Sequence, residues 1–370
     1  MRYDVIRNKH IMKKTETAKM VRKEKTEQKQ KCHCKKMTCR TRNVFIALAL
    51  ICSIYVIAKQ PNMDYDVLNR IRSTIRSEDG IEILYTVGGW HNFNTTFFIE
   101  SSGIGYLNDR YACSVEAAAR LQHPLPVILY MTGIKKEAIA RYNPWTKNFT
   151  NLKLVKVDPG ILFKNTSFDR LYLDVKGQAT DLTEHISDMM RVFLLKHYGG
   201  LYLDTDTVLL KNTSSFDSFL LYNLVNGIMK FESNHFLINE MYNTLAQKKY
   251  NNRSWDGLGF RTILDITKKY CKLSLEKGNF DEAGKNCNLT FLRTETFLPI
   301  KWVDWKNGLF IQSFKKLEDF RPNVMKNAYG IHFNNHLTSN IPIVRKKGQI
   351  HEIIAEQYCP LVYSTLPKVY

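Results

Sequence analysis

The sequence predicts an α/β fold, with a parallel sheet covered by helices, behind a single membrane anchor. Three observations predict it. Strand-like apolar runs alternate with helix-like segments after residue 95, a helical apolar stripe leads through two glycines into another strand-like run near residue 200, and an uncharged apolar stretch occupies 43–58. Parallel strands need a crossover connection, usually a helix, so this alternation is typical of parallel sheets.

The formal net charge of +19 is concentrated at the amino-terminal end of the 370-residue chain. The first 42 residues contain 15 Lys and Arg against 4 Asp and Glu, which leaves a mildly basic body. A nucleic-acid-binding domain would be expected to carry a basic face on its folded part. We therefore expect no nucleic acid among the partners.

The apolar stretch 43–58 reads NVFIALALICSIYVIA and is flanked by basic residues. As a helix it would span about 24 Å, and snorkelling flanks can cover the difference from the ~30 Å hydrocarbon core. A core helix and a signal peptide are alternatives, but the basic region before it is far too long for an ordinary signal peptide. We predict a type II signal anchor, with a cytosolic tail at 1–42, a stem at 59–80 and a lumenal domain at 81–370, because basic residues stay on the cytosolic side.

Four cysteines follow the anchor, and an oxidising lumen favours disulfides between them. Cys113, Cys271, Cys287 and Cys359 allow three pairings. We favour Cys271–Cys287, which closes a short loop and leaves Cys113–Cys359 to tie the early part of the domain to its end. Six Asn-x-Ser/Thr sequons also follow the anchor and imply surface exposure wherever they are glycosylated. They begin at Asn94, Asn148, Asn165, Asn212, Asn252 and Asn288.

The elements before the central segment are predicted from local patterns. We expect a buried strand at 95–102, a helix at 113–124 that a proline ends, a strand at 126–133, and an alternating strand at 152–158. Together they give the strand–helix–strand rhythm from which the sheet is inferred.

The clearest helix is predicted in TDLTEHISDMMRVFLLKHYGG. Asp181 is its expected N-cap, with Glu184 three residues on as in a capping box. Asp188 and Arg191 lie one turn apart on a face different from that of the apolar stripe. One of the two closing glycines is expected to supply a left-handed cap, and a strand follows directly. The apolar stripe consists of Leu182, Ile186, Met189, Met190, Phe193 and His197.

The elements after the central segment are less regular. We expect a strand with a turn at 224–231, a helix at 259–271, an irregular aromatic stretch at 297–305, and a short strand within 329–336 that ends at His332.

Two carboxylates interrupt the strand-like run LYLDTDTVLL. In a regular strand Asp204 and Asp206 would point to the same face. Carboxylates that close raise each other's pKa unless a cation lies between them, and oxygen ligands suit Mg²⁺ or Mn²⁺. Ligands of open α/β sheets bind at the carboxyl ends of strands. We therefore predict a metal site, although a capped turn, with Asp188 and Arg191 as a surface ion pair, is the plain structural alternative.

A phosphatase motif fits the same residues. DTDTVL matches the Asp-x-Asp-x-(Thr/Val)-(Leu/Val) pattern of dehalogenase-type phosphatases, whose first aspartate is a covalent nucleophile. That fold also needs a downstream Gly-Asp-x-x-x-Asp motif, which the sequence lacks, and its first motif normally opens the domain. The phosphatase remains a remote alternative.

The segment HISDMMRVFLLKHYGGLYLDTDTVLLKN resembles the central motif of the Asp-x-Asp sugar-binding glycosyltransferases. FFIESS, CSVEAAAR, VNGIMKFE, FLPIKWVDW, YGIHF and QYCP resemble their α-1,4-glycosyltransferase branch, in family order across about 95–360. The resemblance implies a GT-A-type fold, a single Rossmann-like nucleotide-sugar-binding domain, in a Golgi membrane enzyme. It implies Mn²⁺-dependent, retaining transfer of galactose or N-acetylgalactosamine from the UDP-sugar to a glycosphingolipid such as lactosylceramide, in α-1,4 linkage.

Two other functions are compatible with that resemblance. The first is an α-1,4-N-acetylglucosaminyl- or N-acetylgalactosaminyltransferase that acts on glycoprotein glycans. The second is a membrane-anchored, lectin-like scaffold that kept the fold and lost turnover.

The resemblance also implies roles for individual residues. Asp204 and Asp206 would hold Mn²⁺ and, through it, the UDP diphosphate. Asp188 and Arg191 would contact the donor sugar and diphosphate. The remaining donor-binding residues would be Phe98, Ile99 and Glu100 on the first strand, Asn226 and Gly227 in a loop near the sugar, and His332 at the diphosphate or metal.

His332 could instead be a buried structural histidine. Trp302, Asp304 and Trp305 could form an acceptor wall or pack in an aromatic core. The chain departs from the family pattern in GLGFRT, which lacks the usual Gly-Pro, and at Asn334, where the family has Trp. Both departures lie toward the acceptor or diphosphate side. They therefore affect the expected identity of the acceptor and the expected role of His332 more than the expected activity.

Overall fold

The computed structural model describes residues 91–134, 143–252, 254, 256–306, 312–315, 319–320 and 322–370, which belong to one compact unit, 65–370. The predicted tail, anchor and stem at 1–80 lie outside the described residues. None of the helices in this described part combines the length and apolarity that a membrane crossing requires.

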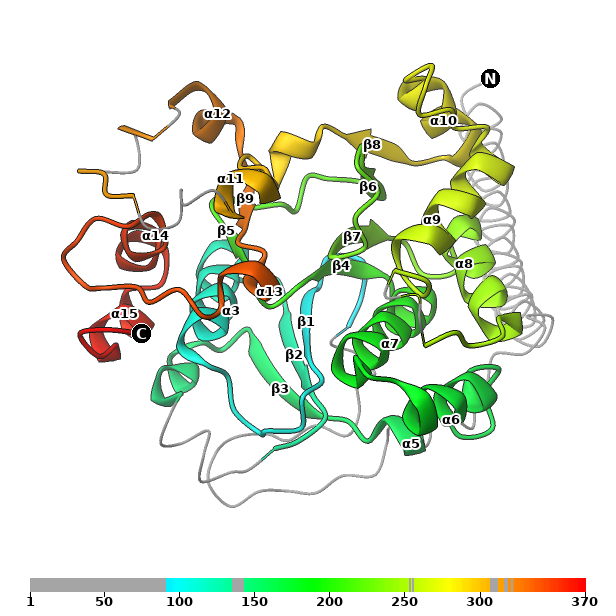
Figure 1. The fold of residues 1–370 in the computed structure, drawn as a ribbon, viewed down its shortest axis with the longest axis horizontal. Helices are drawn as coiled ribbons and strands as arrows, with labels where there is room; N and C mark the ends of the chain where they lie inside the picture. The colour runs from blue at the N-terminus through cyan, green and yellow to red at the C-terminus, as the bar shows by residue number, and fades with distance from the viewer. Residues whose placement is uncertain are drawn as a thin grey trace, which may run out of the picture. The chain divides into compact units, whose positions relative to one another are not determined.

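The strands and helices are labelled as in Figure 1. The strands are β1 (Thr96–Glu100), β2 (Val127–Met131), β3 (Leu152–Lys156), β4 (Gly200–Leu203), β5 (Thr207–Leu209), β6 (Phe219–Leu221), β7 (Ile228–Phe231), β8 (Thr290–Leu292) and β9 (Gly330–His332). The α-helices are α3 (Asp109–Gln122), α5 (Pro159–Phe163), α6 (Asp169–Gln178), α7 (Leu182–Tyr198), α8 (Phe236–Gln247), α9 (Phe260–Ile266), α10 (Phe280–Cys287), α11 (Trp302–Lys306), α12 (Pro322–Asn327), α13 (Asn335–Thr338), α14 (Ile350–Tyr358) and α15 (Pro360–Thr365). Short helical turns are η1 (Pro144–Asn148), η2 (Thr267–Cys271) and η3 (Thr294–Thr296).

The main sheet has the strand order β3-β2-β1-β4-β7-β6-β8, and β5 pairs with β9 in a separate two-stranded sheet. The strands β3, β2, β1 and β4 are parallel, as the sequence predicts. The expectation of a wholly parallel sheet is wrong for the other half, because β7 runs antiparallel to β4 and β6 antiparallel to β7. No described helix connects β4 to β7, so the chain returns through strands and turns, and such a return gives antiparallel pairing.

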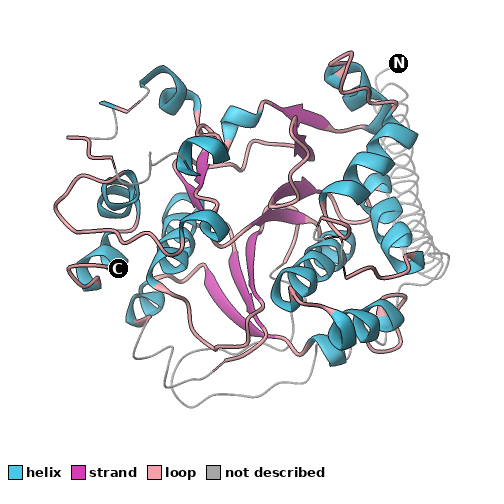
Figure 2. Ribbon diagram, viewed as in Figure 1, coloured by secondary structure: helices cyan, strands magenta, loops and turns pink. Residues whose placement is uncertain are grey.

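Helices cover both faces of the sheet, as Figures 1 and 2 show. Side chains alternate along a strand, so neighbouring residues pack into different cores. Phe98 and Leu203 pack with α3, α14 and α15 in one hydrophobic cluster. Phe97 and Tyr202 pack with α6, α7 and α8 in the other. The parallel half therefore forms the three-layer α/β sandwich that the strand–helix rhythm predicts.

Most predicted elements are present, with shifted ends. Helix α3 begins four residues before the predicted start, because the Asn108 side chain accepts the Tyr111 N–H and caps it. The helix predicted at 259–271 is α-helical to Ile266 and then ends in a π-helical turn. The irregular aromatic stretch contains the short helix α11.

The link between α7 and β4 depends on two glycines. Gly199 and Gly200 both have positive φ, 74° and 105°, which other residues rarely adopt. A Cβ on Gly199 would lie 2.7 Å from the Ser233 nitrogen, and one on Gly200 would lie 2.7 Å from the Thr95 carbonyl. The predicted left-handed cap is wrong in detail, since the ψ of Gly199 is −158° and not helical.

The predicted capping box is also incomplete. Asp181 occupies the N-cap position without capping through its side chain, because its carboxylate accepts the Thr180 hydroxyl instead.

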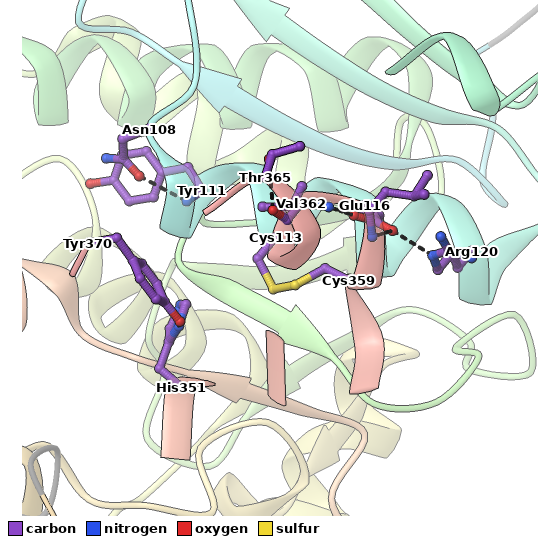
Figure 3. The surroundings of a disulfide bond; sticks show 11 residues. Asn108, Tyr111, Cys113, Glu116, Arg120, His351, Cys359, Val362, Thr365 and Tyr370 are labelled. Atoms are coloured by element: carbon purple, nitrogen blue, oxygen red, sulfur yellow. Dashed lines mark hydrogen bonds and ion pairs between the residues drawn. A yellow bond between two sulfur atoms is a disulfide. The ribbon is translucent and has the colours of Figure 1, made fainter. Parts of the chain in front are cut away.

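Both favoured disulfides are present in the structure. Cys271–Cys287 closes a short segment, and Cys113–Cys359 joins residues 246 apart in the sequence. Figure 3 shows that the longer bridge attaches α3 to the carboxy-terminal helices. Beside it the buried carboxylate of Glu116 accepts the N–H groups of Leu361 and Val362 at the start of α15. The last part of the chain is thus held against α3 by covalent and polar contacts.

Candidate functional site

The two aspartates lie in a turn, not in a strand. Strand β4 ends at Leu203, and β5 begins at Thr207 in a different sheet, so the run that contains the aspartates is not a regular strand. The Thr207 N–H donates to the Asp204 carbonyl at 2.9 Å and closes the turn. Asp204 is still the first residue past the carboxyl end of a parallel strand, where a ligand site is expected.

Asp204, Asp206 and His332 form a cluster in which one ligand atom from each lies within 4.8 Å of the others. Nε2 of His332 is 3.0 Å from Oδ1 of Asp206 and 3.9 Å from Oδ2 of Asp204. Strand pairing creates this proximity, since Thr207 on β5 is opposite His332 on β9. The prediction that His332 lies at the metal group is therefore geometrically sound.

The charges of His332 and Asp206 stabilise each other. Burial alone would lower the pKa of His332, but the charge and hydrogen bond of Asp206 and the charge of Asp204 raise it overall. Burial alone would raise the pKa of Asp206, but the charge of His332 and its hydrogen bond lower it overall. Without a metal, His332 therefore binds a proton more readily than an ordinary histidine does.

Main-chain groups hold Asp206 from the same side. The Asn335 N–H donates to Oδ2 of Asp206 at 2.7 Å, and the Phe333 N–H donates to the Asp206 carbonyl at 3.0 Å. Nε1 of Trp305 donates to the His332 carbonyl at 3.3 Å, and Trp305 is fully buried. Trp305 is therefore a packing residue that orients His332, whereas Trp302 is 57% exposed and remains available as an acceptor wall.

Arg191 holds the other side of the site. Its guanidinium is 3.3 Å from the carboxylates of both Asp188 and Asp204. It also donates to the Asn226 carbonyl at 3.0 Å and to the backbone and hydroxyl of Ser187. Because the side chain of Arg191 is 6% exposed and that of Asp188 11%, the surface ion pair is the wrong reading of this motif.

Ser187 and Tyr202 connect Arg191 to Asp204 by a second route. The Tyr202 hydroxyl donates to Oδ1 of Asp204 at 2.6 Å. The Ser187 hydroxyl lies 3.2 Å from the Tyr202 oxygen and accepts from Arg191 at 2.8 Å. Since Tyr202 gives its proton to Asp204, Ser187 is the donor to Tyr202. Sequence reasoning missed both residues, although Tyr202 is two residues before Asp204, the spacing that places side chains on one strand face.

Asn226 and Gly227 contact two of the aspartates directly. Nδ2 of Asn226 donates to Oδ1 of Asp188 at 2.6 Å, and the Gly227 carbonyl accepts the Asp204 N–H at 2.7 Å. A Cβ on Gly227 would collide with Oδ2 of Asp204, so only glycine allows this approach. Burial raises the pKa of Asp188, an effect that Arg191 opposes.

The three donor-binding residues predicted on the first strand differ in their surroundings. Phe98 and Ile99 are buried in the hydrophobic clusters on opposite faces of the sheet, so donor binding by their side chains stays a prediction. Glu100 ends β1 with Oε1 bonded to Ser102, and among the described residues its buried Oε2 has no hydrogen-bond partner. Burial raises the pKa of this carboxyl. Glu100 is thus the residue of the three that has an unused polar atom.

A divalent cation fits the cluster. Asp204, Asp206 and His332 offer carboxylate oxygens and an imidazole nitrogen, ligand types that divalent metals accept. In the part of the chain that the structure describes, Nδ1 of His332 is buried without a hydrogen-bond partner, so Nε2 is the nitrogen with a defined role. Glycine at 227 leaves Oδ2 of Asp204 uncovered by a side chain at that position.

Comparison with known families matches two adjacent regions of the chain. The glycosyltransferase sugar-binding region containing the DXD motif matches residues 109–225. The alpha 1,4-glycosyltransferase conserved region matches residues 230–366. The two regions include Asp188, Arg191, Asp204, Asp206 and His332, whereas Asn226 and Gly227 fall between them.

Curated relatives have matching names. Lactosylceramide 4-alpha-galactosyltransferase of Rattus norvegicus is 27% identical over 288 residues, which cover 73% of this chain and 75% of the relative. Alpha-1,4-N-acetylglucosaminyltransferase of Homo sapiens is 25% identical over 271 residues, 70% of this chain and 76% of the relative. A galactosyltransferase solved with donor and acceptor sugar analogues is 14% identical, with a TM-score of 0.36, over 74% of this chain and 98% of that one.

The fold, the acidic cluster and these matches define an enzyme of the glycosyltransferase class. Within that class the chain is similar to the α-1,4-glycosyltransferases and contains a match to the DXD sugar-binding region.

Proposed function

We propose that the protein is a retaining Golgi galactosyltransferase or N-acetylgalactosaminyltransferase with a GT-A-type catalytic domain. It moves the sugar from UDP to a glycosphingolipid such as lactosylceramide in α-1,4 linkage. The observation that carries the proposal is the Asp204–Asp206–His332 cluster, which is joined to Asp188 through Arg191 at the carboxyl edge of the parallel strands. Similarity to lactosylceramide 4-alpha-galactosyltransferase supports the choice of donor and acceptor.

Asp204, Asp206 and His332 would hold the cation, which we propose to be Mn²⁺. When bound, this cation neutralises charge that develops on the diphosphate leaving group. Arg191 is bonded to several protein groups, so its main task is to fix Asp188 and Asp204 and to add positive charge nearby. Asp188 and Asn226 form the polar floor that would accept hydrogen bonds from, or donate them to, sugar hydroxyls.

The configuration at the anomeric carbon is retained if the acceptor hydroxyl attacks that carbon from the same face that the diphosphate leaves. The bond between the anomeric carbon and the UDP oxygen breaks as the acceptor hydroxyl forms its new bond to that carbon. The hydroxyl proton passes to a diphosphate oxygen. We favour this route because no carboxylate of the site is assigned as a covalent nucleophile. Asp188 is already bonded to both Arg191 and Asn226.

The proposed location depends on the sequence before the catalytic domain. The basic tail at 1–42 and the apolar stretch at 43–58 support a type II anchor that places 81–370 in the lumen. The two disulfides support an oxidising compartment. The exposed sequon residues Asn94, Asn148, Asn165, Asn212 and Asn288 are compatible with it.

The test is a donor screen with the full chain purified in detergent. UDP-galactose, UDP-N-acetylgalactosamine and UDP-N-acetylglucosamine are each incubated with Mn²⁺ and lactosylceramide, with EDTA as the control. We expect α-linked product from one of the first two donors and none with EDTA. Phosphatase activity on simple esters that excess UDP does not inhibit would contradict the proposal.

A second candidate is an α-1,4-N-acetylglucosaminyl- or N-acetylgalactosaminyltransferase that acts on glycoprotein glycans. The similarity to the human alpha-1,4-N-acetylglucosaminyltransferase favours it. Product from UDP-N-acetylglucosamine, or transfer to a glycoprotein but not to lactosylceramide, would identify this case. Binding of UDP-sugars without hydrolysis or transfer would instead indicate a lectin-like scaffold.

A further inference from the structure

Gly259 lies with its bare Cα against the side chain of Asn226. It immediately precedes α9, and a Cβ at this position would lie 2.7 Å from Cγ and 2.9 Å from Oδ1 of Asn226, and would collide with Nδ2. The three nearest atoms to such a Cβ are thus all atoms of the Asn226 carboxamide. Glycine at 259 therefore leaves the space that this carboxamide occupies.

The Asn226 carboxamide is held in one orientation by the site. Its Nδ2 donates to Oδ1 of Asp188 at 2.6 Å, and the Asn226 carbonyl accepts from Arg191 at 3.0 Å. Only Nδ2 of a carboxamide can donate, so a carboxamide that turns or shifts to make room for a side chain at 259 loses its bond to Asp188. Because Asp188 is buried, solvent is a poor replacement for the lost donor.

Hydrogen bonds fix the backbone around Gly259. The Gly257 carbonyl accepts from both Nζ of Lys248 and the Thr262 hydroxyl. The Thr262 hydroxyl accepts in turn from Lys248 at 3.0 Å. The Gly259 carbonyl accepts the Ile263 N–H at 3.2 Å in the first turn of α9, and Thr262 and Ile263 are both buried. A side chain added at 259 would therefore displace the carboxamide more readily than the backbone.

We propose that Gly259 is a positioning residue for the donor sugar, which acts through Asn226. With no side chain at 259, the carboxamide stays on Asp188 and completes the polar floor that these two residues form. The bond to Asp188 uses one amide hydrogen, so the carboxamide can still offer its second hydrogen and its oxygen to sugar hydroxyls. The inference rests on the proposed function, since it needs a donor sugar held at Asp188 and Asn226.

One departure from the family pattern lies in the same segment. Gly259 belongs to GLGFRT, which lacks the usual Gly-Pro. The structure places this segment against Asn226, which the resemblance assigns to the donor sugar. We therefore expect the departure to affect the use of the donor.

The test compares Gly259→Ala with wild type in the full chain, in detergent with Mn²⁺. Loss of a hydrogen bond to a charged group predicts about a 10- to 100-fold lower kcat/KM for the UDP-sugar that wild type uses in the donor screen. The inhibition constant of UDP should be unchanged, because UDP lacks the sugar. Gly177→Ala on α6 is the matched control, because an added Cβ there meets nothing within 4 Å, and it should match wild type in both measurements.

A double-mutant cycle tests whether the effect passes through Asn226. Asn226→Ala removes the carboxamide, and with it the three atoms nearest to an added Cβ at 259. We expect Asn226→Ala to lower kcat/KM by a similar factor, and the addition of Gly259→Ala to it should cause no further loss. A loss of equal size in both backgrounds would overturn the proposal, because it would then come from the backbone and not from the carboxamide. If Gly259→Ala alone does not fold, the double variant still decides, since it should fold and match Asn226→Ala.

The remaining outcomes separate this inference from the proposed function. A kcat/KM of Gly259→Ala equal to that of wild type would overturn the inference alone, and so would a double variant that does not fold. An affinity of Gly259→Ala for UDP that falls as much as its transfer would also overturn it, because the damage would then extend beyond the sugar. Failure of wild type itself to transfer sugar from any of the UDP-sugars would refute the proposed function, and this inference with it.

Discussion

Asp204 and Asp206 are two residues apart, yet different regions of the molecule support them. Asp204 is held by Tyr202 and Arg191, which come from the adjacent strand and helix. Asp206 is held by His332 and Asn335, which follow it by more than 120 residues. The first support is local in sequence, and its positive charge persists at neutral pH because arginine keeps its proton. The second support is remote in sequence, and its histidine can gain or lose a proton.

This difference separates two tasks within one cluster. The Arg191 side is a permanent positive charge that orients carboxylates. The His332 side offers a nitrogen ligand that can lose its proton to a metal. The predictions below test whether the two sides behave so differently.

The largest effect is expected from removing either carboxylate. Asp206→Asn and Asp204→Asn should each reduce metal-dependent transfer on the order of 1,000-fold, because each removes a ligand and a charge from the leaving-group site. Their stabilities should differ. In Asp206→Asn the imidazole can deprotonate, whereas Asp204→Asn leaves the buried Arg191 with one carboxylate fewer, which costs about 1–3 kcal/mol. Product assays and chemical denaturation measure the two effects.

Asp281→Asn, at an exposed position of α10, is the matched control and should change neither quantity. Wild-type turnover by Asp206→Asn would remove the basis for the metal cluster. Equal stabilities of Asp204→Asn and Asp206→Asn at neutral pH would contradict the distinction between the Arg191 side and the His332 side.

The next effect concerns the geometry of Arg191. Arg191→Lys keeps the charge but cannot reach Asp188, Asp204, Ser187 and Asn226 together, so we expect about 100-fold lower activity and a loss of about 3 kcal/mol in stability. Arg261→Lys is the surface counterpart, since Arg261 pairs with Asp256 at 2.7 Å but is 64% exposed. That change should leave the stability nearly unchanged, because solvent screens an exposed pair. Similar losses of stability in Arg191→Lys and Arg261→Lys would show that burial does not increase what an arginine ion pair contributes.

The local side of the cluster could be predicted from the sequence. Helix α7, the two glycines and β4 are consecutive, so Asp188, Arg191 and Asp204 were predictable from periodicity and spacing. The parallel strands followed from the same local patterns. Tyr202 could have been found from the strand alternation before Asp204, and Ser187 from its place one helical turn before Arg191. The resemblance, not spacing, pointed to His332.

The remote side gave no local signal. His332 and Asn335 reach the cluster only because β5 pairs with β9, which brings β9 and the start of α13 to Asp206. Sequence periodicity cannot predict such strand pairings, because residues this far apart in the sequence share no turn or helix face. The antiparallel half of the sheet was missed for the same reason, and the expectation of a regular strand through Asp206 failed because the carboxylates end β4.

A smaller effect is expected from the hydroxyl that supports Asp204. Tyr202→Phe removes the 2.6 Å bond to Oδ1 and leaves the Ser187 hydroxyl without its acceptor. We expect metal affinity to fall about tenfold, since groups behind a ligand typically contribute that much. Calorimetric titration with Mn²⁺ measures it, and the control is Tyr222→Phe, because the Tyr222 ring stacks on Phe280 at 4.0 Å outside the cluster. Unchanged affinity would mean that Arg191 alone fixes Asp204.

The smallest effect is the pH dependence that His332 confers. Its pKa is raised above 6.5, so without metal the imidazole keeps its proton to a higher pH than usual. A metal needs the neutral form, so affinity should fall as the pH is lowered through that raised pKa, by at most about tenfold per pH unit. Mn²⁺ titration between pH 6 and pH 8 measures the slope. His332→Gln should flatten it, and a slope unaffected by that change would assign the proton elsewhere.

The attachment of the chain's end to α3 has a consequence for biosynthesis. During translation the strands and helix that carry Asp188, Arg191, Asp204 and Asp206 emerge first and can fold first. They lack His332 and Asn335 until more than 120 further residues have been made, and α15 secures that later segment only when Cys359 meets Cys113 and the N–H groups of Leu361 and Val362 donate to Glu116. A premature stop codon that removes only α14 and α15 would therefore leave every residue of the cluster in place and still yield an inactive polypeptide. The carboxy-terminal helices, and not only the segment with the aspartates, would be intolerant of truncation.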